Sequence, residues 1–138
     1  MRVTLQTKAK TRTRILESAR KLFIAKGFDA TTTRDIASAA KIATGTLFNY
    51  FPSKEALGMT VLAEVLEAGH DDFGDRRRGV ESLQEDLFLL IICSLRRLEE
   101  CRKFVAPVVE AALSPFTQSP LCKEADAFRV RHLERMAA

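Results

Sequence analysis

Apolar residues recur at three- and four-residue spacing along most of this chain, which is the period of an amphipathic helix. Residues 11–26 carry the first such stripe, and Gly27 follows at the position where a left-handed residue ends a helix. Shorter patterns predict helices over residues 33–40 and 44–51. Strand signals are scarce, since the sequence contains no Asn-Gly or Asp-Gly pair to form a tight hairpin. We therefore predict an all-α chain.

Capping residues indicate where the next helices begin. Thr32, followed three residues later by Asp35, forms a capping box ahead of the second helix. Ser53 offers a cap for a fourth helix over residues 54–68. Ser82 and Glu85 form a second capping box, which predicts another helix that ends near residue 101. These local signals place most helix starts without any knowledge of the tertiary structure.

Glycine, proline and charged residues divide the rest of the chain into segments. The stretch GHDDFGDRRRG, residues 69–79, is rich in glycine and charge and predicts a linker. Pro107 is expected to start or kink a helix that ends near Leu113. We predict a flexible basic arm over residues 1–10, a helix-turn-helix domain over 11–53 and a helical C-terminal region over 54–138.

Charge is distributed unevenly between the two halves of the chain. Residues 1–54 contain eleven Lys and Arg against three acids, whereas residues 55–138 contain eleven against fifteen. A basic half joined to an acidic half is typical of a protein in which one part contacts a polyanion such as DNA. A basic face is also common on ordinary solvated surfaces, so charge alone leaves both interpretations open.

Cysteines and hydrophobic runs exclude several other classes of protein. Cys93, Cys101 and Cys122 are odd in number and lack CxxC spacing, which argues against a disulfide framework or a zinc site. The apolar run from Leu87 to Leu95 is too short to span a bilayer. We predict a cytoplasmic protein with no metal, no cofactor and no membrane segment.

The segment TTRDIASAAKIATGTLFNYFPSKEAL, residues 32–57, has the form of a helix-turn-helix unit. Small residues such as Ala37 and Ala40 allow two short helices to cross at a steep angle. Thr44, Gly45 and Thr46 would let the second helix approach DNA closely, with two hydroxyls to bond base edges or phosphates. The alternative is a small three-helix core in which Thr44 only caps a helix.

The segment from Thr11 to Leu62, which contains the string RILESARKLFIAKGFDATTTRDIASAAKIATGTLFNYFPSKEAL, closely resembles the DNA-binding domain of the TetR family of transcriptional regulators. The resemblance runs almost continuously from the first helix into the fourth. It implies a three-helix DNA-binding domain joined through the fourth helix to a helical C-terminal region. It also implies homodimers that bind palindromic double-stranded DNA operators and are released by small ligands.

The resemblance also implies roles for individual residues. The recognition helix corresponds to residues 44–51, with Thr44, Gly45 and Thr46 at positions that contact bases and backbone. Tyr50 and Thr33 match positions that bond phosphate, and Arg34 matches one that can reach a base. The other DNA-contact positions are Phe48, where tyrosine is usual, Asn49, and Lys54, whose cation lies at a helix N-terminus that favours phosphate.

Two departures from the family pattern stand out. Lys41 occupies a turn position where glycine is usual, so we expect a positive φ, which costs a non-glycine residue on the order of 1 kcal/mol. Family members also continue beyond the length of this chain, and their last helices build the dimer interface. We therefore expect either a fragment or shortened product, or a dimer that uses other surfaces.

The leading functional hypothesis is a ligand-responsive repressor. A second hypothesis is a shortened family member that pairs with a full-length relative and modulates it. An enzyme is disfavoured, because His70 falls in the predicted linker and His132 in a late helix, with no nucleophile at a suitable spacing.

The C-terminal region carries a weaker pocket prediction. A small apolar ligand would be lined by Leu87, Ile91, Phe104, Val108 and Phe116, although apolar residues at helical spacing are more often ordinary core. The helix after Ser82 carries more apolar residues than one face can hold. We therefore predict self-association or aggregation through residues 82–138.

Overall fold

The computed structural model describes residues 5–77, 82–113, 130 and 134. Within these ranges the chain forms helices and no strand, which confirms the all-α prediction. The helices are α1 (Leu5–Lys26), α2 (Thr33–Ala39), α3 (Thr44–Phe48), α4 (Lys54–Arg76), α5 (Leu83–Glu99) and α6 (Arg102–Leu113). In this part of the chain, no helix is both long and apolar enough to cross a membrane.

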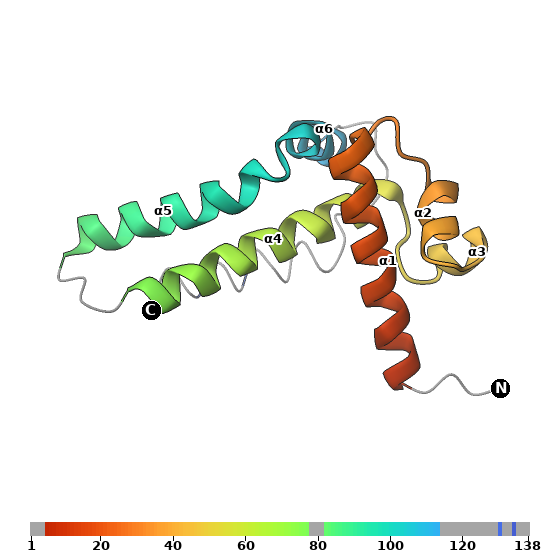
Figure 1. The fold of residues 1–138 in the computed structure, drawn as a ribbon, viewed down its shortest axis with the longest axis horizontal. Coiled ribbons are helices and arrows are strands. Elements are labelled where there is room, and N and C mark those ends of the chain that lie inside the picture. Colours follow the sequence, from red (N-terminus) through yellow and green to blue (C-terminus); the bar gives the residue numbers. More distant parts are fainter. Residues whose placement is uncertain (1–4, 78–81, 114–129, 131–133, 135–138) are drawn as a thin grey trace.

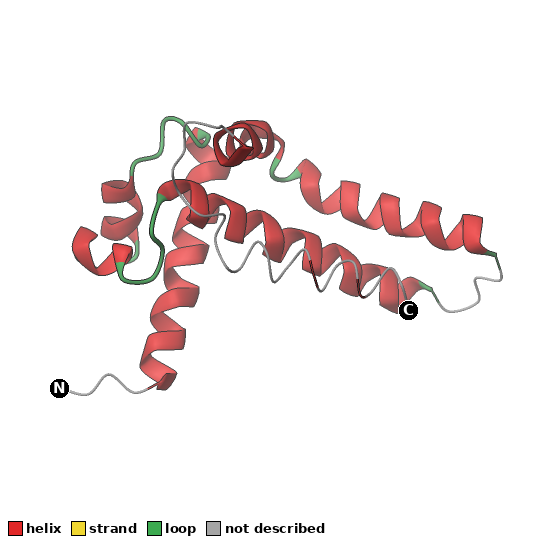
Figure 2. Ribbon diagram, turned by 180° about the vertical axis from the view of Figure 1, so that it is seen from behind, coloured by secondary structure: helices red, strands yellow, loops and turns green. Residues whose placement is uncertain are grey.

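The helices form a compact head and a long arm (Figure 1). Helices α1, α2 and α3 gather around the start of α4. Helix α4 runs away from this head, and α5 returns alongside it in the opposite direction. Helix α6 then packs against both α1 and the first turns of α4. The view from behind shows the same arrangement (Figure 2). Of the two described helices that follow α4, α6 is the one that lies against the head.

The predicted caps begin three of these helices. The Thr32 hydroxyl accepts a hydrogen bond from the Asp35 backbone N–H, and the Asp35 carboxylate accepts one from the Thr32 N–H, both at 3.1 Å. Ser53 and Ser82 accept from backbone N–H groups three residues later, at 3.1 and 3.2 Å. These bonds satisfy donors that a helix leaves unpaired at its start.

Backbone conformation in the turns also agrees with the sequence. Gly27 ends α1 with φ +87°, and Lys41 adopts φ 53° between α2 and α3. The positive φ predicted for Lys41 is confirmed. The strain at this position, on the order of 1 kcal/mol, is retained in the turn that sets α3 against α2.

One continuous core joins the head to α6. The Phe23 ring lies 5.3 Å from that of Phe28 and 5.4 Å from that of Phe104 in α6, measured between centroids. Val108 is also fully buried in this core, against Phe28 and Gly58. Cys93 and Cys101 are buried thiols, as expected of core residues, and burial raises the pKa of Cys101.

Helix α1 begins earlier than predicted. Its first residue is Leu5, so residues 5–10, expected to be part of a flexible arm, are helical. Their side chains are exposed, so the sequence contains no apolar stripe that would predict a helix over these residues. They continue the helix because they contain neither Gly nor Pro and include good helix formers, while the hydroxyls of Thr11 and Thr13 bond carbonyls four residues earlier.

The linker predicted over residues 69–79 is wrong for residues 69–76, which belong to α4. Gly69 packs against α5: a Cβ at this position would lie 3.1 Å from Ser94 Cα. The Arg97 guanidinium donates two hydrogen bonds to the Asp72 carboxylate, at 2.6 and 2.8 Å. Glycine and charge here serve close packing and ion pairing between two helices, which the sequence pattern could not distinguish from a flexible linker.

Helix α3 is shorter than predicted. It ends at Phe48 rather than at residue 51, but the backbone N–H groups of Tyr50 and Phe51 still bond the Leu47 carbonyl, at 2.9 and 3.0 Å. Phe51 is therefore held in the core. Pro107 lies inside α6 rather than at its start.

Candidate nucleic-acid interface

The start of α3 presents a small, open surface. Gly45 is exposed, and a Cβ added there would meet no atom within 4 Å. Thr44 and Thr46, on either side, are half-buried. The large apolar side chain of Phe48 is 46% exposed. This face can accept a rigid surface at close range.

Thr33 and Arg34 form the first turn of α2, which the capping box begins. Thr33 is half-buried and Arg34 is exposed. The hydrogen bond from the Thr32 backbone N–H, followed by that with the Thr32 hydroxyl, lowers the pKa of Asp35 below its ordinary value. The exposed Arg34 therefore lies next to a cap whose carboxylate, Asp35, is ionised at neutral pH.

Buried small and apolar residues hold α2 against α3. Ile36, Ala37, Ala40 and Leu47 have at most 1% of their surface exposed. The Ile42 N–H bonds the Ala37 carbonyl at 3.0 Å and so closes the turn. The two short helices are thus packed against each other across a tight turn, which is the arrangement of a helix-turn-helix.

Lys54 has an intramolecular role that the sequence did not reveal. Its ammonium donates to the carbonyls of Phe28 and Thr31, at 3.0 and 3.3 Å, and lies 4.2 Å from the centroid of the Phe28 ring. These contacts tie the start of α4 to the loop between α1 and α2. A phosphate contact would have to use the remaining N–H of this ammonium.

The other two predicted contact residues differ in burial. Asn49 is exposed after the end of α3, whereas Tyr50 is half-buried and packs on the core. Phe51 next to it is covered by the Arg12 guanidinium, 5.3 Å from its ring centroid. Tyr50 is therefore placed by the core, and Asn49 by the short turn that follows α3.

The residues predicted to line a ligand pocket do not come together. Leu87 and Ile91 are exposed, at 44% and 54%, while Phe104 and Val108 are fully buried in the core. Phe116 lies outside the described residues. None of the four described residues lines the cavity that the structure places between α4, α5 and α6.

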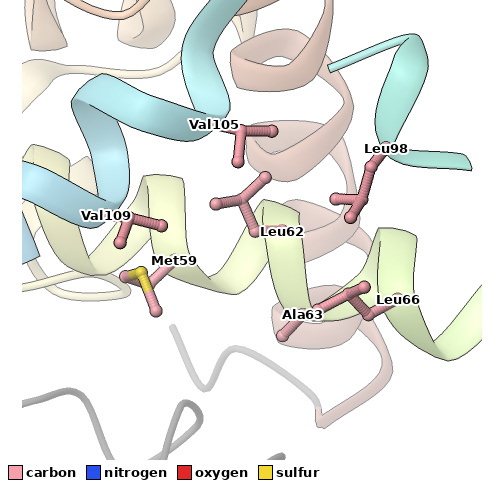
Figure 3. Close-up of a pocket in the computed structure, with 7 residues that line it drawn as sticks. All are labelled: Met59, Leu62, Ala63, Leu66, Leu98, Val105 and Val109. Atoms are coloured by element: carbon pink, nitrogen blue, oxygen red, sulfur yellow. The ribbon is translucent and has the colours of Figure 1, made fainter. Parts of the chain in front are cut away.

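This cavity has a volume of about 180 Å³. Its lining consists of Met59, Leu62, Ala63 and Leu66 of α4, Leu98 of α5, and Val105 and Val109 of α6. Figure 3 shows these side chains converging from the three helices. The four lining residues of α4 recur at i, i+3, i+4 and i+7, which is the spacing of one helix face. This apolar spacing is the sequence signal from which they could have been predicted.

Comparison with known sequences decides the family. Residues 15–58 match the model for "Bacterial regulatory proteins, tetR family". The chain belongs to the TetR family. The match covers the last three turns of α1, both helices of the helix-turn-helix, and the start of α4.

Two curated relatives of this TetR-family chain are named as transcriptional repressors. The HTH-type transcriptional repressor KstR2 of Rhodococcus jostii is 44% identical over 72 residues, which are 51% of this chain and 33% of the relative. DhaR, an HTH-type transcriptional repressor of a Mycobacterium species, is 30% identical over 99 residues, 72% of this chain and 43% of the relative. The chain spans less than half the length of either protein.

Solved structures of the family share the fold over a larger part of the chain. A TetR-family regulator from Shewanella is 29% identical with a TM-score of 0.58, covering 92% of this chain and 66% of the other. PfmR from Thermus thermophilus is 31% identical with a TM-score of 0.52, covering 88% and 65%. The likeness thus extends beyond the head into α5 and α6.

Proposed function

We propose that this chain is a sequence-specific DNA-binding repressor that binds a palindromic operator as a homodimer and is released by a small ligand. The observation that carries the proposal is the open face of α3. A helix whose start has a bare, exposed glycine between two threonines can bring its backbone against DNA, where side chains would otherwise hold it away.

The surroundings of this face support the same function. Arg34 at the start of α2 adds an exposed cation, and the first 54 residues carry the excess of basic residues. Relatives in the same family are named as transcriptional repressors. Thr33, Thr44, Thr46 and Tyr50 are the proposed neighbours of bases and phosphates.

Two glycines give a matched test of this proposal. Gly45 and Gly74 are both helical, and an added Cβ meets nothing within 4 Å at either site. Gly→Ala should leave folding unchanged or stabilise it slightly in both cases. We expect Gly45→Ala to weaken operator binding by at least about tenfold, because a tightly packed interface tolerates no added methyl without a shift.

Gel-shift titration with an operator selected from random DNA measures this effect. Gly74→Ala should bind DNA like the wild type, since it lies at the far end of α4. If the Gly45→Ala and Gly74→Ala variants bound the operator with equal affinity, α3 would not be part of the DNA interface. Failure to select any operator would argue against sequence-specific binding by this chain.

A second candidate function, pairing with a full-length relative, is favoured by the surface of α5. Leu83, Phe88 and Leu95 are 74%, 67% and 56% exposed, more apolar surface than a helix usually leaves to solvent. Mixing the chain with a full-length family protein and measuring the mass of the complex tests this function. A mixed dimer that no longer binds the operator would favour it over repression.

A further inference from the structure

Helices α2 and α3 contain three large apolar side chains, and one of them faces outward. Ile36 and Leu47 have no exposed surface, whereas Phe48 is 46% exposed. Because Leu47 is held in the core, the side chain that follows it on the helix turns away from the core. Helix α3 lies at the edge of the head opposite the arm of α4 and α5 (Figures 1 and 2). The docking of α3 therefore keeps the Phe48 ring at the outer surface of the head.

Phe48 shares one side of α3 with Gly45. Residues three apart are neighbours on a helix surface. A Cβ added at Gly45 would nevertheless meet no atom within 4 Å, so the Phe48 ring leaves the glycine uncovered. A rigid surface that approaches the backbone at Gly45 therefore also comes close to this ring.

The chemistry of the ring restricts what it can recognise on DNA. A phenyl ring has no conventional hydrogen-bond donor or acceptor, so it cannot pair with a phosphate oxygen or with the polar edge of a base. In the major groove, the distinctive apolar group among the four bases is the C5-methyl of thymine. Contact between the ring and this methyl removes apolar surface of both from water, which is favourable. Thymine is therefore the base that suits Phe48.

We propose that Phe48 determines the specificity at one base pair of each operator half-site by packing on the C5-methyl group of a thymine. The proposal rests on the operator binding proposed above and adds the base that this residue reads. The hydroxyls of the half-buried Thr44 and Thr46 can form polar contacts on the same short helix, whereas Phe48 supplies an apolar one.

A uracil scan of the selected operator tests this contact. Each thymine is replaced in turn by deoxyuridine, symmetrically in both half-sites, which removes the methyl and leaves the hydrogen-bonding groups of the base pair in place. We expect at least one position to lose about tenfold in affinity, since a buried methyl contributes about fourfold in each half-site. At that position, 5-methylcytosine should bind more tightly than cytosine by a similar factor. Gel-shift titration measures all four operators.

Two variants test whether Phe48 is the residue that reads this methyl. Phe48→Ala should bind the thymine operator more weakly than the wild type and should bind the thymine and uracil operators equally. Phe73→Ala makes the same change at a half-buried ring near the end of α4 and should keep the full methyl dependence. Should Phe48→Ala fail to fold, Phe48→Asn replaces the ring with a polar side chain and must abolish the methyl dependence as well.

The outcomes separate this contact from the proposed function. An operator in which no uracil lowers the affinity overturns the thymine contact and leaves repression standing. If Phe48→Ala weakens binding without any effect of uracil, the ring lies on the DNA backbone. Methyl dependence that persists in Phe48→Ala assigns the thymine to another residue, and this too overturns the proposal. A chain for which no operator can be selected refutes sequence-specific repression, and this contact with it.

Discussion

At the scale of single residues, Lys54 acts as a tether. Its ammonium bridges two loop carbonyls and the Phe28 ring, and the carbonyl of Thr31 belongs to a residue with no exposed surface. Removing a charged donor from such carbonyls leaves them poorly satisfied. This side chain therefore helps to hold the loop between α1 and α2 against the start of α4.

We expect Lys54→Ala to lower the free energy of unfolding by about 1–3 kcal/mol and to weaken binding to all DNA sequences alike. Urea denaturation and gel shifts at several salt concentrations measure both effects. A phosphate contact would in addition flatten the log–log salt slope by about 0.9. Lys21 is an exposed lysine of α1, so Lys21→Ala is the control for stability. If the Lys54→Ala protein were as stable as the Lys21→Ala protein, the tethering role of Lys54 would be refuted.

The capping carboxylate of Asp35 predicts a pH dependence. Its pKa is lower in the folded chain because the carboxylate accepts hydrogen bonds at the cap. A depressed folded pKa contributes stability above the unfolded pKa, about 4, and that stability is lost as pH falls through the folded value. The stability gap between wild type and Asp35→Asn should thus narrow below about pH 4. Thermal melts from pH 7 to pH 3 measure it, and a constant gap would contradict the assignment.

At the scale of elements, glycines decide how closely helices pack. Gly69 brings α4 against the backbone of α5, since an added Cβ would lie 3.1 Å from Ser94 Cα and 3.4 Å from the Cys93 carbonyl oxygen. The ion pairs Asp72–Arg97 and Arg77–Asp86 lie along the same helix pair. The arm is thus a packed antiparallel pair instead of two helices on a flexible linker.

Gly69→Ala should destabilise the chain by about 1–3 kcal/mol, because the contacting atoms are backbone and cannot rotate away. Gly74→Ala on the same helix, where space is open, should be neutral or slightly stabilising. Denaturant unfolding of the two variants gives the comparison. Equal stability would show that α5 moves away from α4 at little cost.

At the scale of the whole molecule, a basic head and an exposed apolar face on the arm determine the expected partners. Leu83, Leu87, Ile91 and Leu95 recur every four residues along α5, and each is 44% exposed or more. Such a stripe favours contact with a second helix. It gives a specific location to the self-association predicted from the sequence.

We expect the chain to sediment as more than a monomer at micromolar concentration, and Ile91→Ser, at the centre of the stripe, to shift it toward the monomer. Arg96→Ser, on the same helix but off the stripe and exposed, is the control. A wild-type chain that remains monomeric while binding a palindromic operator tightly would refute association through α5.

The sequence by itself determined what depends on neighbours a few residues apart. The caps at Thr32 and Ser53 and the stop at Gly27 could be predicted, because each depends on hydrogen bonds or sterics within one turn. The positive φ of Lys41 was expected from the resemblance to the TetR family, in which glycine is usual at this turn position. The order of the short helices, and with it the helix-turn-helix, follows from the same local signals. The individual candidate DNA-contact residues, by contrast, were implied by the resemblance to the TetR family and not by these local signals.

The tertiary structure decided what depends on contacts between distant segments. Lys54 pairs with carbonyls more than twenty residues earlier, Gly69 packs against a helix that begins after it, and the cavity joins side chains of three helices. Spacing along the chain does not encode these contacts, because they depend on the distances and angles at which helices dock. A charged residue, a glycine and an apolar stripe each permit several roles, and docking selects one.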